Sequence, residues 1–532
     1  MVDTATKTVD LIDEEFHREE ILDRWLTVGV AALTLFAAWI RVSGLSNGSF
    51  YRDDAWVALT SRVPVSEAWK MVGTAPGFTM FERYWVQITS PSTWWAQLPT
   101  FLVAVLAVPL IVAICRWWGL SRWTSLLAGA LIAVSHVAVI YATHLKPYSH
   151  DLIAGTVVLA AAEWWRRGNT AWLFTALAAM SFAVSFTIFP LILGCGVVIL
   201  VQSISSKRTL GVIAPLAVLA GACGGLYWAV HNGISPRLKQ SWQSNFFSYH
   251  SLSAFKGSFV HIFSGLIWGF GDTTPALHLA GYSKLFIVVI VVFAVIGMTR
   301  IDQTIMPLAA VIAAVAMSAF HEIALGTGRT DAYLYPAIAI LVAYGAEATY
   351  RFLAAKQRYL AYVVAAGLIC VVTFAGVDRA THRPTYPGGS INPVLAAARE
   401  VIIVNGGVII EGTARWPWTY YGARHVVLVF SPEYNTGFAP VSLNPRVAVM
   451  KGTIIEGGYD PIAAVDKVAR LPLVLYVRTD DWSALGDPLR VALTNACFHE
   501  FNFQHTPGYL LEWLQKGSCP EKAPHRVPPR RP

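Results

Sequence analysis

The stretch WAQLPTFLVAVLAVPLIVAICRWWGLSR, residues 95–122, decides the class of fold. It carries no charged side chain from Leu98 to Cys115, and Arg116 and Arg122 follow directly. A run of about 20 apolar residues is the length that crosses the hydrocarbon core of a bilayer as a helix. We therefore predict a membrane-spanning helix that ends in a basic loop.

The composition of the whole chain points to the same class. The 532 residues are 55% hydrophobic and only 14% charged, whereas soluble domains average about 25% charged residues. A soluble fold could not bury so much apolar surface, so the bilayer must solvate most of it. The net charge of +8 does not indicate nucleic-acid binding, because Lys and Arg gather in the cytoplasmic loops of membrane proteins. We expect the lipid bilayer, and no nucleic acid, as a partner.

Eleven stretches are predicted to cross the membrane. They are residues 25–44, 93–115, 122–143, 151–165, 171–188, 190–204, 210–230, 284–299, 304–321, 332–349 and 359–377. With segment 1–24 in the cytoplasm, every cytoplasmic loop is short and basic, as the positive-inside rule requires. The basic residues of these loops are Arg116, Arg122, Arg166, Arg167, Lys207, Arg208, Arg300, Arg351, Lys356 and Arg358. We predict a polytopic α-helical membrane module over residues 25–377.

This orientation places loops 45–92 and 231–283, and the chain after residue 377, on the extracytoplasmic side. Residues 378–520 alternate helix-like stretches such as INPVLAAAREVIIV with β-branched runs such as LPLVLYVR, which predicts a small α/β domain. Cys497 and Cys519 lie in it, and a disulfide between them is expected in an oxidising compartment, two unpaired thiols being the alternative. The Pro- and Arg-rich residues 521–532 are predicted to be disordered.

A pair of adjacent carboxylates, Asp53 and Asp54, stands in the first extracytoplasmic loop, within YRDDAW at 51–56. Two carboxylates can act as a general base, bind a metal or cap a helix. A helix N-cap explains one aspartate, but not two flanked by Arg52 and aromatic residues. We predict a catalytic role for the pair. A divalent metal at Asp53 and Asp54 stays open, and no cofactor motif is evident elsewhere.

A second polar cluster, HLKPYSHD at 144–151, follows the third predicted span. Lys146 with the imidazole of His144 and the phenol of Tyr148 suits a phosphate. The alternative is an interfacial belt, in which Lys snorkels and Tyr lies at headgroup level.

A third cluster, HEIALGTGRTDAYLYP at 321–336, contains Arg329 beside two glycines. Glycines let a loop approach a ligand closely, and Arg329 could then hold an anion. An ordinary polar turn is the alternative.

These features, in this order, resemble the GT-C superfamily of integral-membrane glycosyltransferases. More narrowly, they resemble the bacterial family of protein mannosyltransferases and lipid A aminoarabinose transferases. The similarity is strongest over residues 45–165, and one departure is Ala75-Pro76-Gly77, where many relatives have a His-Pro-Pro-like segment. The stretches that carry it are Asp53-Asp54, TAPGFTMFERYW at 74–85, residues 95–122, AVSHVAVIYATHLKPYSHD at 133–151 and GRTDAYLYP at 328–336.

The resemblance implies a multi-pass protein of the bacterial plasma membrane that uses a polyprenyl-phosphate sugar as donor. The sugar would pass to a glycan, lipid or protein acceptor at the extracytoplasmic face. Asp53, or else Asp54, would be the general base for the acceptor hydroxyl. Lys146, Tyr148 and Arg329 would bind the donor phosphate. The supporting residues would be His144, Asp151, Arg52 and Glu82.

Two further questions stay open. The aromatic cluster RWPWTYYG at 415–422 either stacks on sugar rings of the acceptor or belongs to a core. A lipid-linked oligosaccharide polymerase or ligase is an alternative function, and a flippase is another. No convincing internal repeat of the kind that many transporters carry is visible. A non-catalytic assembly protein, with the aspartate pair as a helix cap, is the third alternative.

Overall fold

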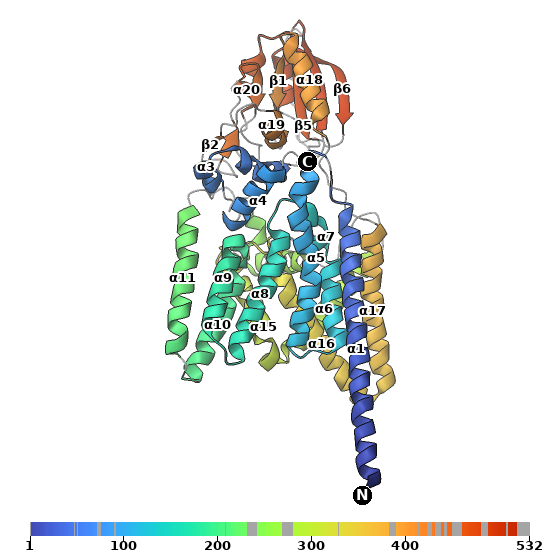
Figure 1. Ribbon diagram of the computed structural model, residues 1–532. Helices are drawn as coiled ribbons and strands as arrows, with labels where there is room; N and C mark the ends of the chain where they lie inside the picture. The colour runs from blue at the N-terminus through green and yellow to red at the C-terminus, as the bar shows by residue number, and fades with distance from the viewer. Residues whose placement is uncertain are drawn as a thin grey trace.

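A computed structural model describes residues 2–518 with gaps. The gaps are 47, 51, 72–75, 90–91, 208, 231–241, 269–279, 328, 382–389, 412–413, 423–427, 431–437, 441–443, 450–459, 480–487 and 507–508. Cys519 and the predicted disordered tail, 521–532, lie outside the described residues. A helical module carries a smaller domain at one end, which we call the domain-bearing end (Figure 1).

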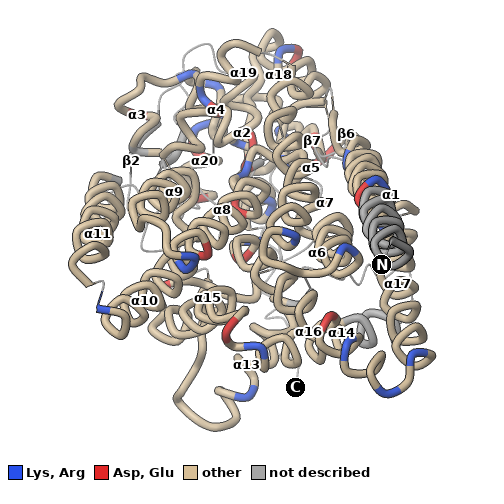
Figure 2. Tube along the Cα trace, turned by 60° about the horizontal axis from the view of Figure 1, so that its bottom comes forward, with Lys and Arg blue, Asp and Glu red and all other residues tan. Residues whose placement is uncertain are grey.

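Apolar helices, most of them long, run side by side and form the module (Figure 1). They are α1 (Val2–Val42), α5 (Thr93–Trp117), α6 (Arg122–Val134), α7 (His136–Ile140), α8 (Tyr148–Arg166), α9 (Ala171–Val184), α10 (Phe189–Ser205), α11 (Leu210–Val230), α13 (Leu252–Trp268), α14 (Ala280–Met298), α15 (Ile301–Ala319), α16 (Tyr335–Lys356) and α17 (Arg358–Thr381). Most of the trace carries uncharged residues (Figure 2), as helices in contact with lipid require.

The chain is a multi-pass membrane protein, as predicted. Within the described part of the chain, seven helices are long and apolar enough to cross a bilayer, or eight if the bent pair Arg122–Val134 and His136–Thr143 forms one span. Two shorter apolar helices, Ala171–Val184 and Ile287–Met298, come close to that length. Each of the eleven predicted stretches overlaps a helix, while the number that crosses the membrane stays a prediction.

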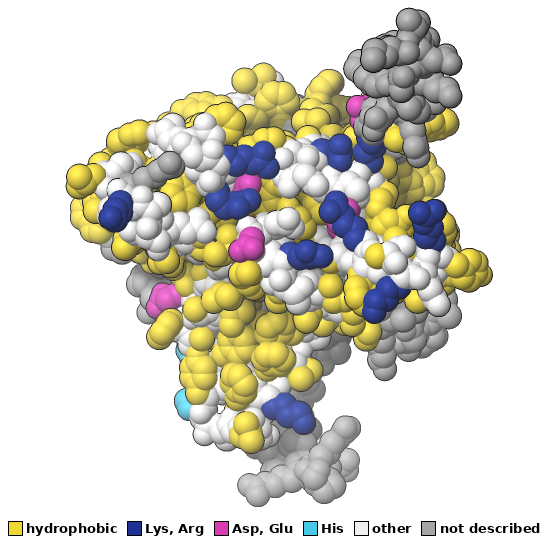
Figure 3. All heavy atoms as spheres, turned by 90° about the horizontal axis from the view of Figure 1, so that it is seen from below, with side chains coloured by type: hydrophobic (Ala, Val, Ile, Leu, Met, Phe, Trp, Pro, Cys, Tyr) yellow, Lys and Arg dark blue, Asp and Glu magenta, His cyan; other side chains and the backbone are white. Residues whose placement is uncertain are grey.

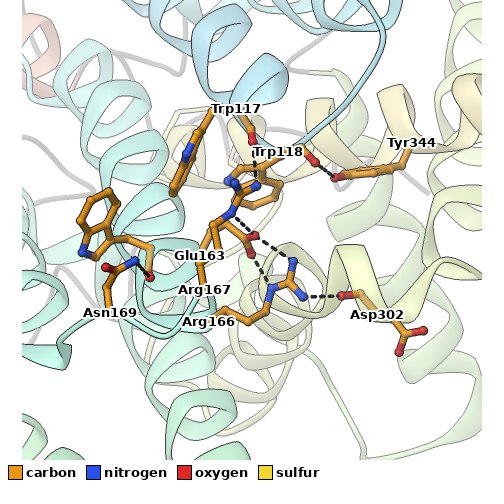
Figure 4. A network of polar contacts seen from close by, with 9 residues as sticks. Trp117, Trp118, Glu163, Arg166, Arg167, Asn169, Asp302 and Tyr344 are labelled. Carbon is orange, nitrogen blue, oxygen red and sulfur yellow. Dashed lines mark hydrogen bonds and ion pairs between the residues drawn. The ribbon is translucent and has the colours of Figure 1, made fainter.

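The face opposite the domain is rich in Lys and Arg (Figure 3). A buried carboxylate, Glu163, organises part of it by pairing with Arg166 at 2.8 Å and Arg167 at 3.1 Å (Figure 4). The same arginines donate to the carbonyls of Asp302 at 3.1 Å and Trp117 at 2.7 Å. Charge-assisted bonds of this kind fix the ends of α8, α5 and α15 against one another.

Four short helices connect α1 to α5 at the domain-bearing end. They are α2 (Arg52–Leu59), η1 (Thr60–Arg62), α3 (Val65–Lys70) and α4 (Pro76–Thr89). Figure 1 shows α3 and α4 between the module and the domain. The sequence predicted this segment only as a loop.

The C-terminal domain is the predicted small α/β domain. Its five-stranded sheet has the order β4-β1-β5-β7-β6, with β4 (Val447–Val449), β1 (Gly407–Ile410) and β5 (Leu473–Thr479) parallel. Successive residues of β1 face opposite sides, so Val408 packs with α18 (Asn392–Ile403) while Ile409 packs with α20 (Pro461–Val468) and α21 (Pro488–Asn495). Helices therefore cover both faces of the sheet.

The antiparallel hairpin of β6 (Phe498–Thr506) and β7 (Tyr509–Lys516) completes this sheet and was not predicted. A separate two-stranded ribbon pairs β2 (Leu428–Phe430) with β3 (Phe438–Pro440). Cys497, just before β6, is disulfide-bonded, while Cys115, Cys195, Cys223 and Cys370 are free.

The domain is attached to the module through the helix α19 (Arg415–Gly422). Trp416 and Tyr420 of α19 are buried in one apolar cluster with Trp56 and Leu59 of α2. The hydroxyl of Tyr421 accepts a hydrogen bond of 3.0 Å from the backbone N–H of Phe50. The RWPWTYYG cluster is therefore core between the two parts, which settles that open question against sugar stacking.

Candidate active site

The helix α2 holds both aspartates in its first turn. The carboxylate of Asp54 is fully buried, lies 3.0 Å from Nδ1 of His144 and accepts a hydrogen bond of 3.1 Å from the backbone N–H of Leu145. Asp53 is instead 58% exposed and faces Lys146, with 3.5 Å between Oδ2 and Nζ. The two aspartates therefore have different environments: Asp54 is fixed in the structure, and Asp53 is open to a substrate.

The segment that meets the aspartates follows a break in a helix. Helices α6 and α7 are bent by 58° at Ser135, which frees backbone carbonyls in a buried place. The buried guanidinium of Arg41 donates to the carbonyls of Ala138 at 2.9 Å and Ile132 at 3.2 Å. Arg379 donates to the carbonyl of Val134 at 3.3 Å. Arg41 of α1 and Arg379 of α17 thus donate hydrogen bonds to the carbonyls at the break. The segment that follows the break carries His144 and Lys146 toward α2.

Lys146 and Arg329 bring positive charge to the same place. Lys146 is 10% exposed, and its Nζ lies 5.5 Å from the centre of the Trp56 ring. The guanidinium of Arg329 lies near Tyr141, Tyr148 and Asp53 and interacts electrostatically with all three. It also lies 4.6 Å from the centre of the Trp242 ring. Burial lowers the pKa of Arg329, but Tyr148, Tyr141 and Asp53 raise it above its ordinary value, so the side chain stays charged.

The turn that carries Arg329 is built around Thr327. Its hydroxyl accepts hydrogen bonds from the backbone N–H groups of Arg329 at 3.1 Å and Thr330 at 2.8 Å, and donates one of 2.8 Å to Asp331. Burial raises the pKa of Asp331 to about 6, although the Thr327 hydroxyl opposes the shift. These local bonds shape the turn, and Arg329 extends from it to the neighbourhood of Tyr141, Tyr148 and Asp53.

Glu82 lies behind the aspartate pair, on α4. The side chain is fully buried, and neither carboxylate oxygen has a hydrogen-bond partner within the described residues. Burial and the charge of Asp54 raise the pKa of Glu82 well above its ordinary value, with the Thr100 hydroxyl opposing them. Burial therefore favours the protonated form of Glu82, which has no hydrogen-bond partner for either carboxyl oxygen within the described residues.

The remaining predicted residues are placed less directly. Asp151 is buried one turn below Tyr148 and accepts a hydrogen bond of 3.0 Å from Thr187. Arg52 begins α2, but its side chain lies outside the described part of the structure. Sequence reasoning missed Tyr141 and Trp242, the neighbours of Arg329. Tyr141 ends an apolar stretch and Trp242 is far away in sequence, so neither carried a signal.

Asp53 and Asp54 are the protein ligands that a metal at the aspartate pair would use. Among the described residues, no group of three or more His, Cys, Asp or Glu side chains is arranged to hold an ion. The carboxylates of Asp53 and Asp54 also interact with different partners, Lys146 and His144. The arrangement instead provides a carboxylate open to a substrate beside two fixed cations, which suits proton removal from one group and stabilisation of an anion on another.

No protein-family model and no curated protein matches the sequence. Solved structures do match. ArnT from Cupriavidus metallidurans in the apo state is similar over 93% of this chain and 98% of its own, at a TM-score of 0.53 and 13% identity. The same protein bound to undecaprenyl phosphate matches over 92% of this chain and 98% of its own, at a TM-score of 0.52 and 14% identity.

The chain has the same fold as ArnT. The resemblance seen in the sequence is thereby confirmed for the fold, and it extends over almost all of the chain rather than residues 45–165 alone. The archaeal oligosaccharyltransferase AglB from Archaeoglobus fulgidus, with a dolichol-phosphate and an inhibitory peptide, matches more weakly. It is similar over 94% of this chain and 75% of its own, at a TM-score of 0.46 and 11% identity. In this fold, Asp53, Lys146 and Arg329 gather at the domain-bearing end.

Proposed function

We propose that the protein is a glycosyltransferase that takes a sugar from a polyprenyl-phosphate donor at the extracytoplasmic face of a bacterial plasma membrane. The observation that carries the proposal is the pairing of exposed Asp53 with Lys146 at 3.5 Å, beside the charged Arg329. The fold it shares with a protein solved with undecaprenyl phosphate supports a donor of this class. The basic face opposite the domain (Figure 3) supports the orientation, because Lys and Arg mark the cytoplasmic side.

The geometry supplies the two charges that the reaction needs. Asp53 removes the proton of the acceptor hydroxyl as its oxygen forms a bond to the anomeric carbon of the sugar. The bond from that carbon to the phosphate oxygen breaks, and polyprenyl phosphate leaves. Lys146 and Arg329 stabilise the negative charge that develops on the phosphate, and Tyr148 provides a hydroxyl next to them. Asp54 acts through position, because its bonds to His144 and Leu145 hold the Lys146 segment against α2.

The test is transfer of radiolabel by membranes that contain either the wild type or Asp53→Asn. General-base catalysis contributes about 100- to 10,000-fold to the rate. The activity of the variant should therefore fall by about 100-fold or more, while its expression is unchanged. Asp466 is an exposed aspartate on α20, far from the site in sequence, and Asp466→Asn is the matched control. Offering several polyprenyl-phosphate sugars in parallel identifies the donor.

Other outcomes point to the alternatives. Full activity in Asp53→Asn would remove the proposed base. Transfer of a preassembled glycan, with no transfer of a single sugar, would indicate an oligosaccharide polymerase or ligase. A flippase would move a fluorescent lipid-linked sugar across vesicles without forming a glycosidic bond.

A further inference from the structure

A short helical turn, η5 (Gln243–Asn245), is bonded to the loop that carries Arg329. Asn245 binds both polar groups of the Leu325 backbone. Its carbonyl accepts from the Leu325 N–H at 3.0 Å, and its side-chain amide donates to the Leu325 carbonyl at 3.2 Å. The hydroxyl of Ser318, near the end of α15, donates to the same Asn245 carbonyl at 3.3 Å. Asn245 is only 8% exposed, so these bonds are sheltered from water.

The same turn also reaches the side chain of Arg329. Trp242 directly precedes η5, and its carbonyl accepts a hydrogen bond of 2.9 Å from the backbone N–H of Asn245. The guanidinium of Arg329 lies 4.6 Å from the centre of the Trp242 ring, within the range of a cation–π interaction. Residues 242–245 therefore hold the loop at two points: Asn245 holds its backbone, and Trp242 contacts the arginine itself.

The helix α13, which follows in the chain, packs closely against the same loop. Gly326 has a φ of +71°, a conformation that favours glycine, and a Cβ at this position would collide with the carbonyl oxygen of Ile262. A Cβ on Gly265 would in turn collide with the carbonyl oxygen of Gly326. The two backbones thus touch without side chains between them. The close packing leaves the loop little room to shift once Asn245 is in place.

We propose that Asn245 is a positioning residue for the donor phosphate, which fixes the loop of Arg329 and, with Trp242, its guanidinium beside Lys146. This inference rests on the proposed function, because it takes Arg329 as a ligand of the phosphate. The Thr327 bonds shape the loop from within, whereas Asn245 anchors it to another part of the chain. A cation stabilises a leaving phosphate fully only when it is held in place before the reaction.

The experiment titrates undecaprenyl phosphate against the full chain in detergent and records the melting temperature, which rises as the lipid binds the folded state. Asn245→Asp keeps the shape of the side chain but replaces the donor to the Leu325 carbonyl with a second acceptor. Gln243→Glu is the matched control, because it makes the same change from amide to carboxylate on an exposed residue of η5. Both substitutions are also made in an Arg329→Met background.

We expect Asn245→Asp to raise the Kd for undecaprenyl phosphate by at least about tenfold, because a displaced Arg329 loses charge-assisted bonds to the phosphate. Gln243→Glu should change the Kd by less than about twofold. In the Arg329→Met background, Asn245→Asp should also change it by less than about twofold, since both substitutions act on the same interaction. A merely structural role would lower the melting temperature without lipid and would not depend on Arg329.

Three results would overturn the proposal. An unchanged Kd in Asn245→Asp, with weaker binding in Arg329→Met, would remove the positioning role alone. Equal losses with and without Arg329 would remove it as well. A wild type that does not respond to the lipid would overturn the proposed donor class, and the positioning role with it.

A second variant keeps the test decisive if Asn245→Asp does not fold. Trp242→Leu removes the ring beside Arg329 at a partly exposed position. The Kd should rise by about threefold when Arg329 is present and stay unchanged in Arg329→Met. A Kd equal to that of the wild type would overturn the proposal.

Discussion

The carboxylate of Asp54 lies 3.0 Å from the imidazole of His144, although 90 residues separate the two in the sequence. The contact joins a helix that follows α1 to the segment that follows a bent pair of helices. Asp54 is fully buried there, whereas its neighbour Asp53 is exposed. Asp54 therefore holds the His144 segment against α2, whereas Asp53 is accessible to a substrate.

This difference predicts that substitution of Asp54 lowers stability, whereas substitution of Asp53 has little effect on it. Asp54→Leu removes the acceptor of the Leu145 N–H and of His144, so it should lower the free energy of unfolding by about 1–3 kcal/mol for each buried group left unpaired. Asp53→Asn should leave stability within about 0.5 kcal/mol, because exposed ion pairs contribute little. Thermal unfolding in detergent measures both. Equal melting temperatures for Asp54→Leu and wild type would contradict the positioning role.

Lys146 should affect donor binding more than folding. Lys146→Met keeps most of the volume of the side chain but removes the charge near the phosphate, so the KM for the donor should rise by at least about tenfold. Lys146→Arg should restore part of the loss. Lys256 is an exposed lysine on α13, and Lys256→Met serves as the control. The prediction fails if Lys146→Met leaves the concentration dependence on the donor unchanged.

Glu82 predicts a pH dependence of stability. Its pKa in the folded protein is raised well above 4.5 by burial and by Asp54. The folded state therefore holds a proton that the unfolded state releases, and stability is lost as the pH rises from 4.5 toward the folded pKa. Glu82→Gln keeps the shape and removes this loss. The variant should gain melting temperature over wild type at pH 8 and gain little at pH 5, and parallel curves across that range would refute the prediction.

Arg41 should affect stability and activity because it donates hydrogen bonds at the helix break, and not because of its charge. Arg41→Met removes the arginine donor of the Ala138 carbonyl and one of the two donors of the Ile132 carbonyl, which also accepts from the backbone N–H of Ser135, so we expect a cost of about 1–3 kcal/mol. Transfer activity should fall as well, because the break directs Lys146 toward Asp53. Arg358→Met, at an exposed arginine that begins α17, is the control and should change neither property. Activity and melting temperature together distinguish a shifted site from simple unfolding.

Most of the helical module could be predicted from the sequence, because a span in lipid must be long, apolar and internally hydrogen-bonded. Lys146 and Asp53 were also predicted to lie at the same face of the membrane, because their charges stand at the ends of apolar stretches. The hairpin of β6 and β7 was missed because the exposed β6, FHEFNFQHT, lacks the alternation of a half-buried strand. The dipeptide Pro507-Gly508 between the two strands was the one available signal for a turn.

Other features depend on contacts that no local pattern encodes. The sequence TMFERYWVQI around Glu82 was predicted only as part of the extracytoplasmic loop 45–92. The packing against η1 and Asp54 turns Glu82 and Arg83 inward. The role of RWPWTYYG was likewise ambiguous, since aromatic residues serve both in cores and in sugar binding. The partner α2, more than 350 residues earlier in the chain, decides in favour of the core.

The burial of α19 against α2 has a consequence for engineering. A hybrid protein that exchanges only the sheet of the C-terminal domain between relatives would keep Trp416 and Tyr420 packed on α2 and Tyr421 bonded to Phe50. A hybrid joined downstream of α17 would replace these contacts as well, and would need the matching residues of α2 to be transplanted with them. Because β1 precedes α19 in the chain and the other four strands of the sheet follow it, no single junction separates the sheet from these contacts.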